Sequence, residues 1–389
     1  MKKYILVFLM SLSLGGCTWI TDYFGGDSNE EPPKPLAEIK NAIEIEQVWS
    51  VTTGKGSGEQ LLRLTPAIDS DKVYVASRDG NLIAYNVSNG EKIWEKETGK
   101  KISAGPGVGE GLVLVGTRNA EVIAFQIADG KQLWSAKVSS EVLSVPVVSD
   151  DTVAVRTADG RVLGLSAQQG KQLWSFYKRE PSLTLRGTSK PVIVNGMVIS
   201  GFDNGQMIAM GLKDGRQIWR RKLAIPRGRT ELERIVDLDA DPVVDKGVIY
   251  VAAFQGKVSA IRQTDGQLFW QRDLSAYNSL SVNKKSLFVT DATSQVWSLH
   301  TVNGASLWRQ DQLQYRSLTA PAVMGNYVVV GDFEGYLHWL SLEDGHLAAR
   351  MRGDSDGFSV APVISGNMLI SYGRDGGLTA FKVNDNTSK

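Results

Sequence analysis

After about residue 44, short apolar runs separated by turn dipeptides fill the chain. In the first unit these runs lie near Ala67–Asp69, Val73–Ser77, Leu82–Asn86 and Lys92–Lys96. β-Branched and aromatic residues dominate the runs, and Asp-Gly or Asn-Gly pairs between them favour tight turns. Nothing outside the first 16 residues has a long helical period. The pattern therefore predicts an all-β chain with four short strands in each unit.

The unit recurs with a period of about 40 residues, which is typical of a repeat architecture. The spacing G-x-x-x-W marks it at Gly90–Trp94, Gly130–Trp134, Gly170–Trp174, Gly215–Trp219, Gly266–Trp270 and Gly304–Trp308. A proline with an apolar pair and a turn with alternating apolar residues each occur eight times, although Leu280 once takes the proline's place. Four strands in each of eight units predict an eight-bladed β-propeller with four-stranded antiparallel blades.

The two ends of the repeat array complement each other. The last unit ends after Phe381 with three strands, whereas Glu46–Ser50 contains Trp49 but follows no earlier unit. We expect residues 45–51 to pair with strand 377–382, closing the ring within a propeller of residues 44–382 and leaving a tail at 383–389. One unit has Ala349 where the others have tryptophan, so we expect that blade to be packed less tightly.

The repeated tryptophan is interpreted as structural. A large amphipathic ring can fill the gap between blades and donate its indole N–H to a backbone carbonyl. The alternative is a row of rings that stack on a ligand, but recurrence in nearly every unit favours packing. The glycine four residues earlier is interpreted as a turn residue with positive φ.

The N-terminus has the features of a lipoprotein leader. Lys2-Lys3 and the apolar run Tyr4–Leu14 predict a signal peptide over residues 1–16, too short to span a bilayer stably. It ends in Leu14-Gly15-Gly16-Cys17, which resembles the lipobox of bacterial lipoproteins. That resemblance implies that Cys17 becomes the acylated N-terminus and, because Thr18 rather than aspartate follows it, that the protein is sorted to the outer membrane. Residues 17–43 read as a lipid-anchored, flexible tether.

Composition and motifs argue against several functions. The 43 basic and 42 acidic residues nearly balance, which argues against a nucleic-acid partner. Cys17 is the only cysteine, so a structural disulfide is excluded. The histidines His300, His338 and His346 lack metal-ligand spacing, and no nucleotide-binding or nucleophile motif is present. We therefore expect no catalytic centre, no metal and no cofactor.

An enzyme remains the alternative, because the tryptophan repeat also resembles that of the quinoprotein dehydrogenases. Those enzymes hold pyrroloquinoline quinone under a disulfide between adjacent cysteines, together with Ca²⁺. This chain lacks a second cysteine for such a disulfide. The resemblance therefore covers the scaffold and not the cofactor site.

Two connections between units are longer than the rest. Trp174 to Pro191 takes 17 residues and Trp219 to Pro242 takes 23, against the usual 12. Both lie on the face that carries the Asp79-Gly80 class of turns, and long loops on a rigid scaffold often carry function.

The two insertions have the composition of a binding surface. The first contains Leu183, Leu185 and Arg186, and the second contains Asp237 and Asp239. Leucine with arginine suits a protein-binding hot spot that nearby carboxylates could orient. The alternative is that the leucines pack on their own blade while Arg186 pairs with Asp237 or Asp239.

Together with the leader and the repeats, three segments carry a more specific resemblance: Ser182–Gly187, Asp237–Asp239 and Gly331–Trp339. With them the whole chain resembles the BamB family of outer-membrane assembly lipoproteins. The resemblance implies a non-enzymatic subunit of the β-barrel assembly machinery, anchored at the periplasmic face of the outer membrane.

The resemblance also implies partners and binding residues. The partners are the periplasmic POTRA domains of BamA, with other subunits of the machinery reached indirectly and unfolded outer-membrane proteins as further candidates. The residues that match the family's BamA-binding positions are Leu183, Leu185 and Arg186, with Asp237 and Asp239 in support.

Overall fold

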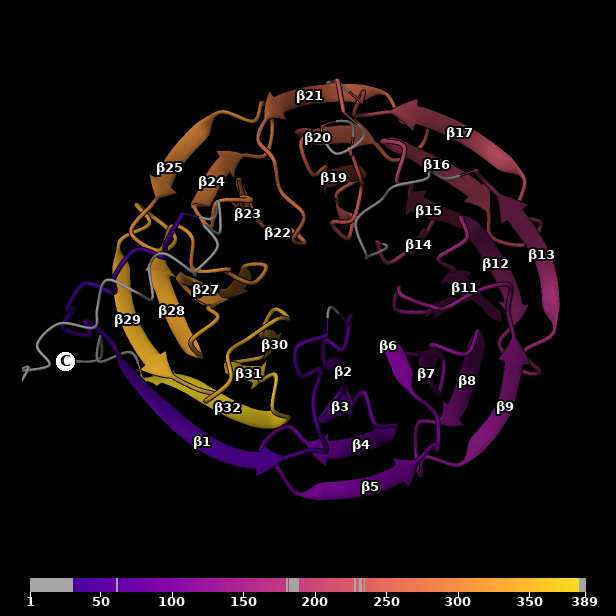
Figure 1. Ribbon diagram of the computed structural model, residues 1–389, viewed down its shortest axis with the longest axis horizontal. Coiled ribbons are helices and arrows are strands. Elements are labelled where there is room, and N and C mark those ends of the chain that lie inside the picture. Colours follow the sequence, from indigo (N-terminus) through magenta and orange to yellow (C-terminus); the bar gives the residue numbers. More distant parts are fainter. Residues whose placement is uncertain are drawn as a thin grey trace, which may run out of the picture. The chain divides into compact units, whose positions relative to one another are not determined.

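The computed structural model describes residues 31–60, 62–179, 181, 189–226, 229–230, 233 and 235–384. All regular structure in these residues is β, arranged as eight four-stranded antiparallel sheets around a ring (Figure 1). The predicted eight-bladed propeller is therefore confirmed. Within the described part of the chain, no helix has the length and hydropathy needed to cross a bilayer.

Each blade runs from an inner strand to an outer strand in chain order. Blade 1 comprises β2 (Ala67–Asp69), β3 (Lys72–Ala76), β4 (Asn81–Asn86) and β5 (Lys92–Glu97). Blade 2 comprises β6 (Ile102–Gly109), β7 (Leu112–Thr117), β8 (Glu121–Gln126) and β9 (Gln132–Lys137). Blade 3 comprises β10 (Val147–Ser149), β11 (Thr152–Arg156), β12 (Arg161–Ser166) and β13 (Gln172–Tyr177). Blade 4 comprises β14 (Val192–Val194), β15 (Met197–Gly201), β16 (Gln206–Gly211) and β17 (Gln217–Lys222).

The second half of the ring repeats this order until the chain closes on itself. Blade 5 comprises β18 (Val243–Asp245), β19 (Val248–Ala252), β20 (Lys257–Arg262) and β21 (Leu268–Asp273). Blade 6 comprises β22 (Ser281–Asn283), β23 (Ser286–Thr290), β24 (Val296–His300) and β25 (Ser306–Gln310). Blade 7 comprises β26 (Ala322–Met324), β27 (Tyr327–Gly331), β28 (Tyr336–Ser341) and β29 (Leu347–Arg352). Blade 8 comprises β30 (Val363–Ser365), β31 (Met368–Tyr372), β32 (Gly377–Asn384) and, from the other end of the chain, β1 (Glu44–Thr52).

The ring closes as the sequence predicts. Strand β1 pairs antiparallel with β32 from Glu44 opposite Asn384 to Thr52 opposite Gly377, with one bulge between Gln47 and Trp49. This pairing completes the eighth sheet with a strand from the start of the chain and covers what would otherwise be an open edge.

The repeated tryptophans fill the junctions between blades. Each indole N–H donates to a backbone carbonyl of the next blade over 2.7–3.1 Å. The donor and acceptor pairs are Trp49 and Val87, Trp94 and Ile127, Trp134 and Ala167, Trp174 and Leu212, Trp219 and Gln263, Trp270 and Thr301, and Trp308 and Leu342. These side chains are buried and bridge neighbouring blades, which is the structural role expected for them.

The glycine of G-x-x-x-W serves the tryptophan of the preceding blade. At Gly130, for example, φ is +69° and an added Cβ would lie 2.6 Å from Cε3 of Trp94. A side chain there would both strain the turn and displace the indole. Each copy of the motif therefore contributes to two blade junctions. Its glycine packs against the tryptophan of the preceding blade, and its own tryptophan packs against the next blade.

Blade 7 provides its large ring from a different strand. In the other seven blades an outer-strand tryptophan stands in register with a small residue of the third strand, as Trp94 does with Ala84. In blade 7 the pair is reversed, because Trp339 on β28 lies opposite Ala349 on β29. Trp339 is fully buried and packs edge-on against Phe381 of blade 8. The loose packing expected from Ala349 alone is therefore compensated by its neighbour.

Residues 33–43, which we call the strap, lie against blade 7. The Ala42 N–H donates to the Ala348 carbonyl over 2.7 Å, and the Lys34 N–H donates to the Gln314 carbonyl over 3.0 Å. Figure 1 shows this indigo segment beside β29. The last part of the segment predicted as a tether thus contacts the propeller.

Candidate partner-binding face

The two long insertions leave the propeller on one face. They connect β13 to β14 and β17 to β18, the outer strand of one blade to the inner strand of the next. Strands within a blade alternate in direction, so these connections share a face with the turns between second and third strands. We call this the connection face. The predicted binding residues Leu183, Leu185 and Arg186 lie outside the described residues, as does the predicted lipidation site Cys17.

The two predicted aspartates are described and are buried inside the face. Asp237 is 0% and Asp239 is 4% exposed, so neither carboxylate forms part of the free surface in this structure. Their neighbours along the chain, including Leu238, are buried as well. The Asp237 carbonyl accepts the Phe254 N–H over 3.0 Å, which attaches the segment to blade 5.

The segment also packs tightly against blade 4. A Cβ added at Gly201, the last residue of β15, would lie 2.8 Å from Cβ of Leu238. The absence of a side chain at Gly201 therefore allows this approach. Residues 235–240 consequently form a fixed base beneath the connection face.

A buried arginine lies beside this base. Arg156 ends β11, is 0% exposed and pairs with Asp203 through Nη2 and Oδ1. Its guanidinium lies 5.1 Å from the centroid of the Phe202 ring, a cation–π arrangement. A charge inside a protein is tolerated only when paired in this way, because desolvation is expensive.

One carboxylate of this region, that of Asp239, has a raised pKa. Burial raises its pKa to about 6, and the nearby Asp203 carboxylate adds to the rise, while Arg63 and Arg156 oppose it. The Oδ1 atom of Asp239 is buried and has no hydrogen-bond donor among the described residues. Arg63 contacts the same residue through the backbone, donating from Nη2 to the Asp239 carbonyl over 2.8 Å. Asp239 thus offers an acceptor to an additional basic group.

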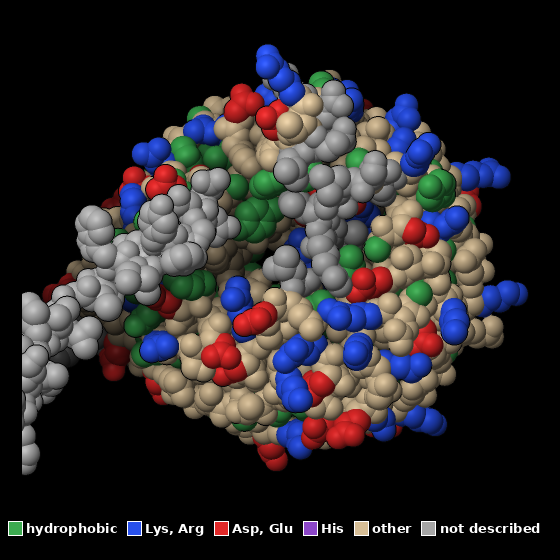
Figure 2. Space-filling model, in the orientation of Figure 1, with side chains coloured by type: hydrophobic (Ala, Val, Ile, Leu, Met, Phe, Trp, Pro, Cys, Tyr) green, Lys and Arg blue, Asp and Glu red, His purple; other side chains and the backbone are tan. Residues whose placement is uncertain are grey.

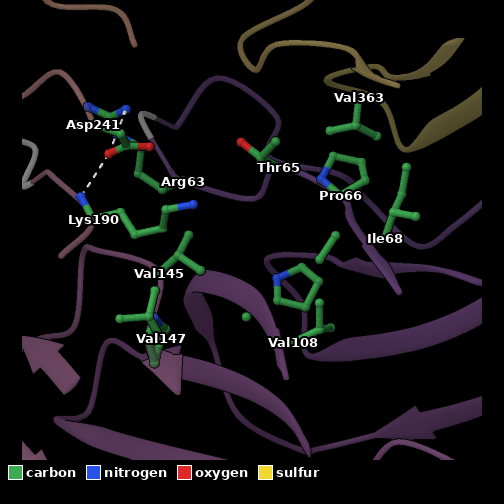
Figure 3. Close-up of a pocket in the computed structure, with 14 residues that line it drawn as sticks. Arg63, Thr65, Pro66, Ile68, Val108, Val145, Val147, Lys190, Asp241 and Val363 are labelled. Atoms are coloured by element: carbon green, nitrogen blue, oxygen red, sulfur yellow. Dashed lines mark hydrogen bonds and ion pairs between the residues drawn. The ribbon is translucent and has the colours of Figure 1, made fainter. Parts of the chain in front are cut away.

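Next to the cluster is a cavity of about 310 Å³ (Figure 3). Inner-strand residues line it, including Ile68, Val108 and Val147 from blades 1 to 3, and its polar side carries Lys190 and Asp241. The Asp241 Oδ1 atom accepts the Lys190 N–H over 2.7 Å, and Arg63 Nη1 stands 4.0 Å from the same oxygen. The site can therefore orient charged side chains beside an apolar wall.

The sequence drew attention to Asp237 and Asp239 but not to the two basic residues nearby, Arg63 and Arg156. Arg156 pairs with the second residue of the third strand, Val162. The same register position holds Ala or Gly in five other blades, Thr290 in blade 6 and Tyr372 in blade 8. An arginine in a slot usually filled by a small residue was the available signal, and it marks a buried charge. Arg63 precedes the first repeat and left no such signal.

The exposed surface carries charges of both signs. On the face shown in Figure 2, basic and acidic side chains are interspersed over the blades, in keeping with the formal net charge of +1. Hydrophobic side chains gather nearer the central opening in that view.

The fold is shared with other propellers of known structure. A quinohemoprotein alcohol dehydrogenase from Comamonas testosteroni superposes with a TM-score of 0.68 at 12% identity, covering 88% of this chain and 77% of that one. A likeness at this identity shows the fold alone. The crystal structure of BamB from Moraxella catarrhalis is more similar, with a TM-score of 0.80 and 25% identity over 87% of this chain and 100% of that one. The molecule is thus an eight-bladed propeller whose outer-strand tryptophans fill the blade junctions.

The sequence comparisons narrow this class to one family. The profile of the family described as "Outer membrane protein assembly factor BamB" matches residues 41–101, 88–310 and 299–389. Relatives that carry the same name are 50% identical in Alkalilimnicola ehrlichii, over 92% of this chain and 93% of the relative, and 44% identical in Pseudomonas aeruginosa, over 98% and 99%. The relative from Escherichia coli is 34% identical over 97% of this chain and 98% of its own length. The chain belongs to the BamB family.

Proposed function

We propose that this chain is a non-enzymatic subunit of the outer-membrane β-barrel assembly machinery. Family membership carries the proposal, because relatives named as outer membrane protein assembly factors match nearly the full length at up to 50% identity. The lipobox at Cys17 supports a lipid anchor that holds the propeller at the periplasmic face of the outer membrane. In this role the protein acts by binding and positioning partners.

The partner surface that we propose is the connection face at blades 3 to 5. Leu183 and Leu185 supply apolar anchors and Arg186 a guanidinium, and the partner is a POTRA domain of BamA. The buried Asp237 and Asp239 act from beneath, since they are 0% and 4% exposed and cannot themselves form a rim. The open acceptor at Asp239 Oδ1 suits Arg186 or a basic group of the partner.

Capture of BamA by the purified, lipidated protein tests this surface. Removing one hot-spot side chain typically costs about 2 kcal/mol or more, roughly thirtyfold in affinity. We therefore expect Leu185→Ala and Arg186→Ala each to weaken BamA capture without lowering the melting temperature. The control is Arg229→Ala in the second insertion, which is exposed and should retain capture. Undiminished binding by the Leu183, Leu185 and Arg186 triple alanine variant would refute the surface.

Two further measurements test the remaining parts of the proposal. Cys17→Ser should give a periplasmic protein that folds but carries no lipid, and mass spectrometry of the parent protein should show acylation of Cys17. Quinone-dependent turnover by the purified protein with added calcium would instead favour the enzyme alternative.

A further inference from the structure

The strap occupies a specific site on blade 7 through both main-chain and side-chain contacts. Asn41 donates from Nδ2 to the Arg350 carbonyl over 3.2 Å, and its Oδ1 accepts the Arg350 N–H over 3.0 Å. These two bonds copy the pairing of a strand residue, so the strap extends blade 7 at the edge of β29. Leu36 packs against the apolar cluster shared by blades 6 and 7, and Lys34 Nζ donates to the Asp311 carbonyl over 3.0 Å.

The site is built on a buried polar network within the segment Gly331–Trp339. Asp332 and His338 are 0% exposed, and Asp332 Oδ2 lies 3.0 Å from His338 Nε2 and 2.9 Å from Arg316 Nε. Arg350 donates from Nε to His338 Nδ1 over 3.3 Å. The imidazole is therefore neutral, with its hydrogen on Nε2, because Nδ1 accepts.

Both arginines of the network also hold the strap. Arg316 donates from Nη1 to the Lys34 carbonyl over 3.2 Å, and Arg350 donates from Nη1 to the Ala37 carbonyl over 3.0 Å. Hydrogen bonds to Asp332 and His338 fix the direction of the two guanidinium groups. The Nη1 donors that bind the strap are therefore preorganised. The segment Gly331–Trp339 thus has a structural task that the partner surface does not explain.

The outer edge of blade 7 differs from its equivalents where the strap lies. In blades 1 to 6 the residue before the outer-strand tryptophan is a large apolar side chain that is 40–52% exposed. The blade 7 equivalent, Ala348, is 2% exposed and accepts the strap's Ala42 N–H. A small residue at this position leaves room for a chain laid across the edge, and that chain shields it from water.

The strap changes the face from which the N-terminal chain leaves. β1 begins at Glu44 opposite Asn384, the end of β32 farthest from the connection face. The strap runs back from there past Ala348 and Arg350 toward Lys34, which bonds to Gln314 in the connection between β25 and β26. The chain therefore crosses the full width of blade 7 and reaches the connection face.

We propose that the strap orients the propeller on the membrane by releasing the lipid-linked segment from the connection face, the same face that carries the insertions of blades 3 to 5. The inference rests on the proposed anchor at Cys17. Residues 18–32 reach at most about 50 Å fully extended, whereas a chain free up to residue 43 would reach about 90 Å from the opposite face. The docked strap thus shortens the free chain between Cys17 and the propeller. It also turns the face that carries the two insertions toward the bilayer.

Energy transfer to labelled vesicles tests this orientation. The full-length lipidated protein is reconstituted in vesicles of phosphatidylethanolamine and phosphatidylglycerol with head-group acceptors. Donors are attached singly at Lys101→Cys, on the connection face of blade 2, or at Lys131→Cys, on the opposite face of the same blade. Both lysines are exposed, and the two faces are a strand length of about 20 Å apart. Acylated Cys17 does not compete for the label.

With the native strap we expect higher transfer from Lys101→Cys, by about twofold or more at this separation. Replacing residues 33–42 by a Gly/Ser segment of equal length should abolish or reverse the difference in transfer between the two donor positions. The free chain would then join the propeller at Glu44, on the opposite face. Leu36→Asp with Asn41→Ala should have the same effect in weaker form, whereas Lys40→Ala, an exposed strap position, should not. An order that is the same with and without the native strap would overturn the proposal.

Two controls separate this inference from the proposed function. Hydrogen exchange at the backbone amides of positions 34 and 42 should be slow in the parent, where Lys34 and Ala42 donate to Gln314 and Ala348, and fast in the Gly/Ser replacement. Fast exchange at these positions in the parent would refute docking. Flotation with vesicles reports the anchor itself. A protein that fails to float refutes anchoring and this inference with it, whereas flotation with unchanged donor order refutes the strap's role alone. The melting temperature verifies that each variant's propeller is folded.

Discussion

Blade 7 and the blades that precede it solve the same packing problem with different strands. In blades 1 to 6 an outer-strand tryptophan packs against the next blade. Its indole N–H donates to a backbone carbonyl of that blade, and its ring packs against a turn glycine there. Blade 7 places Trp339 on its third strand and Ala349 on its outer strand. The Trp339 Nε1 atom is buried and has no acceptor among the described residues.

The difference shows that the junction requires buried volume more than a particular hydrogen bond. Dispersion and the hydrophobic effect depend on filled space, whereas one indole hydrogen bond contributes only about 1 kcal/mol net. Moving the ring inward also leaves small residues, Ala348 and Ala349, on the outer edge of blade 7. That is the edge along which the strap lies.

The largest effect should come from removing a whole junction. Deleting residues 44–52 takes away β1, the pairing with β32 and the buried Trp49. Loss of a buried tryptophan alone costs about 3–5 kcal/mol, and the exposed edge of β32 adds to this. Thermal unfolding should show a strongly lowered melting temperature. An unchanged midpoint would mean that blade 8 closes without β1.

The next largest effect should come from removing a single ring, either Trp339 on a third strand or Trp308 on an outer strand. Trp339→Ala and Trp308→Ala should each lower the free energy of unfolding by about 3–5 kcal/mol, since both rings are buried. Trp308→Ala should cost about 1 kcal/mol more, because it also removes the donor to the Leu342 carbonyl. Urea denaturation measures the difference. A cost below about 1 kcal/mol for Trp339→Ala would show that this ring does not fill the blade 7 junction.

A pair of turn glycines isolates the contact of the ring from the strain of the backbone. Gly345 and Gly325 both have positive φ, at +76° and +57°, but only Gly345 faces an indole, that of Trp308. Gly325→Ala should therefore cost about 1 kcal/mol from the left-handed backbone alone. Gly345→Ala should cost a further 1–3 kcal/mol or so, because Trp308 must shift. Equal costs in thermal unfolding would exclude this role for the glycine.

The smallest effect concerns pH and the network under the strap. Burial lowers the pKa of His338, although Asp332 opposes the shift, while Arg350 and Arg316 add to it. As pH falls below about 6.5, the unfolded chain binds a proton that the folded chain does not yet bind. The free energy of unfolding should then fall, by at most about 1.4 kcal/mol per pH unit, until the folded pKa is reached.

His338→Gln should remove this dependence, since glutamine does not titrate. The difference between parent and variant is the quantity to measure between pH 7 and 5. Asp239 and Asp354 have raised pKa values, about 6 and about 7, and act in the opposite direction in both proteins. A difference that does not change with pH would contradict a neutral His338.

Much of the architecture followed from local patterns. Strand runs, turn dipeptides and the forty-residue period predicted eight blades, and the unmatched Trp49 strand predicted the closure at β32. These features are encoded within each unit, because a strand and its turn depend on neighbouring residues. The prediction failed to place the compensating ring of blade 7, because Trp339 belongs to a different motif from Ala349.

Contacts between distant segments were decided by the tertiary structure. Arg63, Arg156, Asp203 and Asp239 come from different blades or from the segment before them, and only the closed ring brings their charges together. The strap accepts hydrogen bonds from Arg316 and Arg350, which lie about 300 positions away in the chain. Pairings of this kind leave no periodic trace in one sequence, because each is made once and its energy depends on burial that exists only after the ring has closed. The sequence by itself determined the repeated unit and its number, and the closed ring decided which single side chains meet.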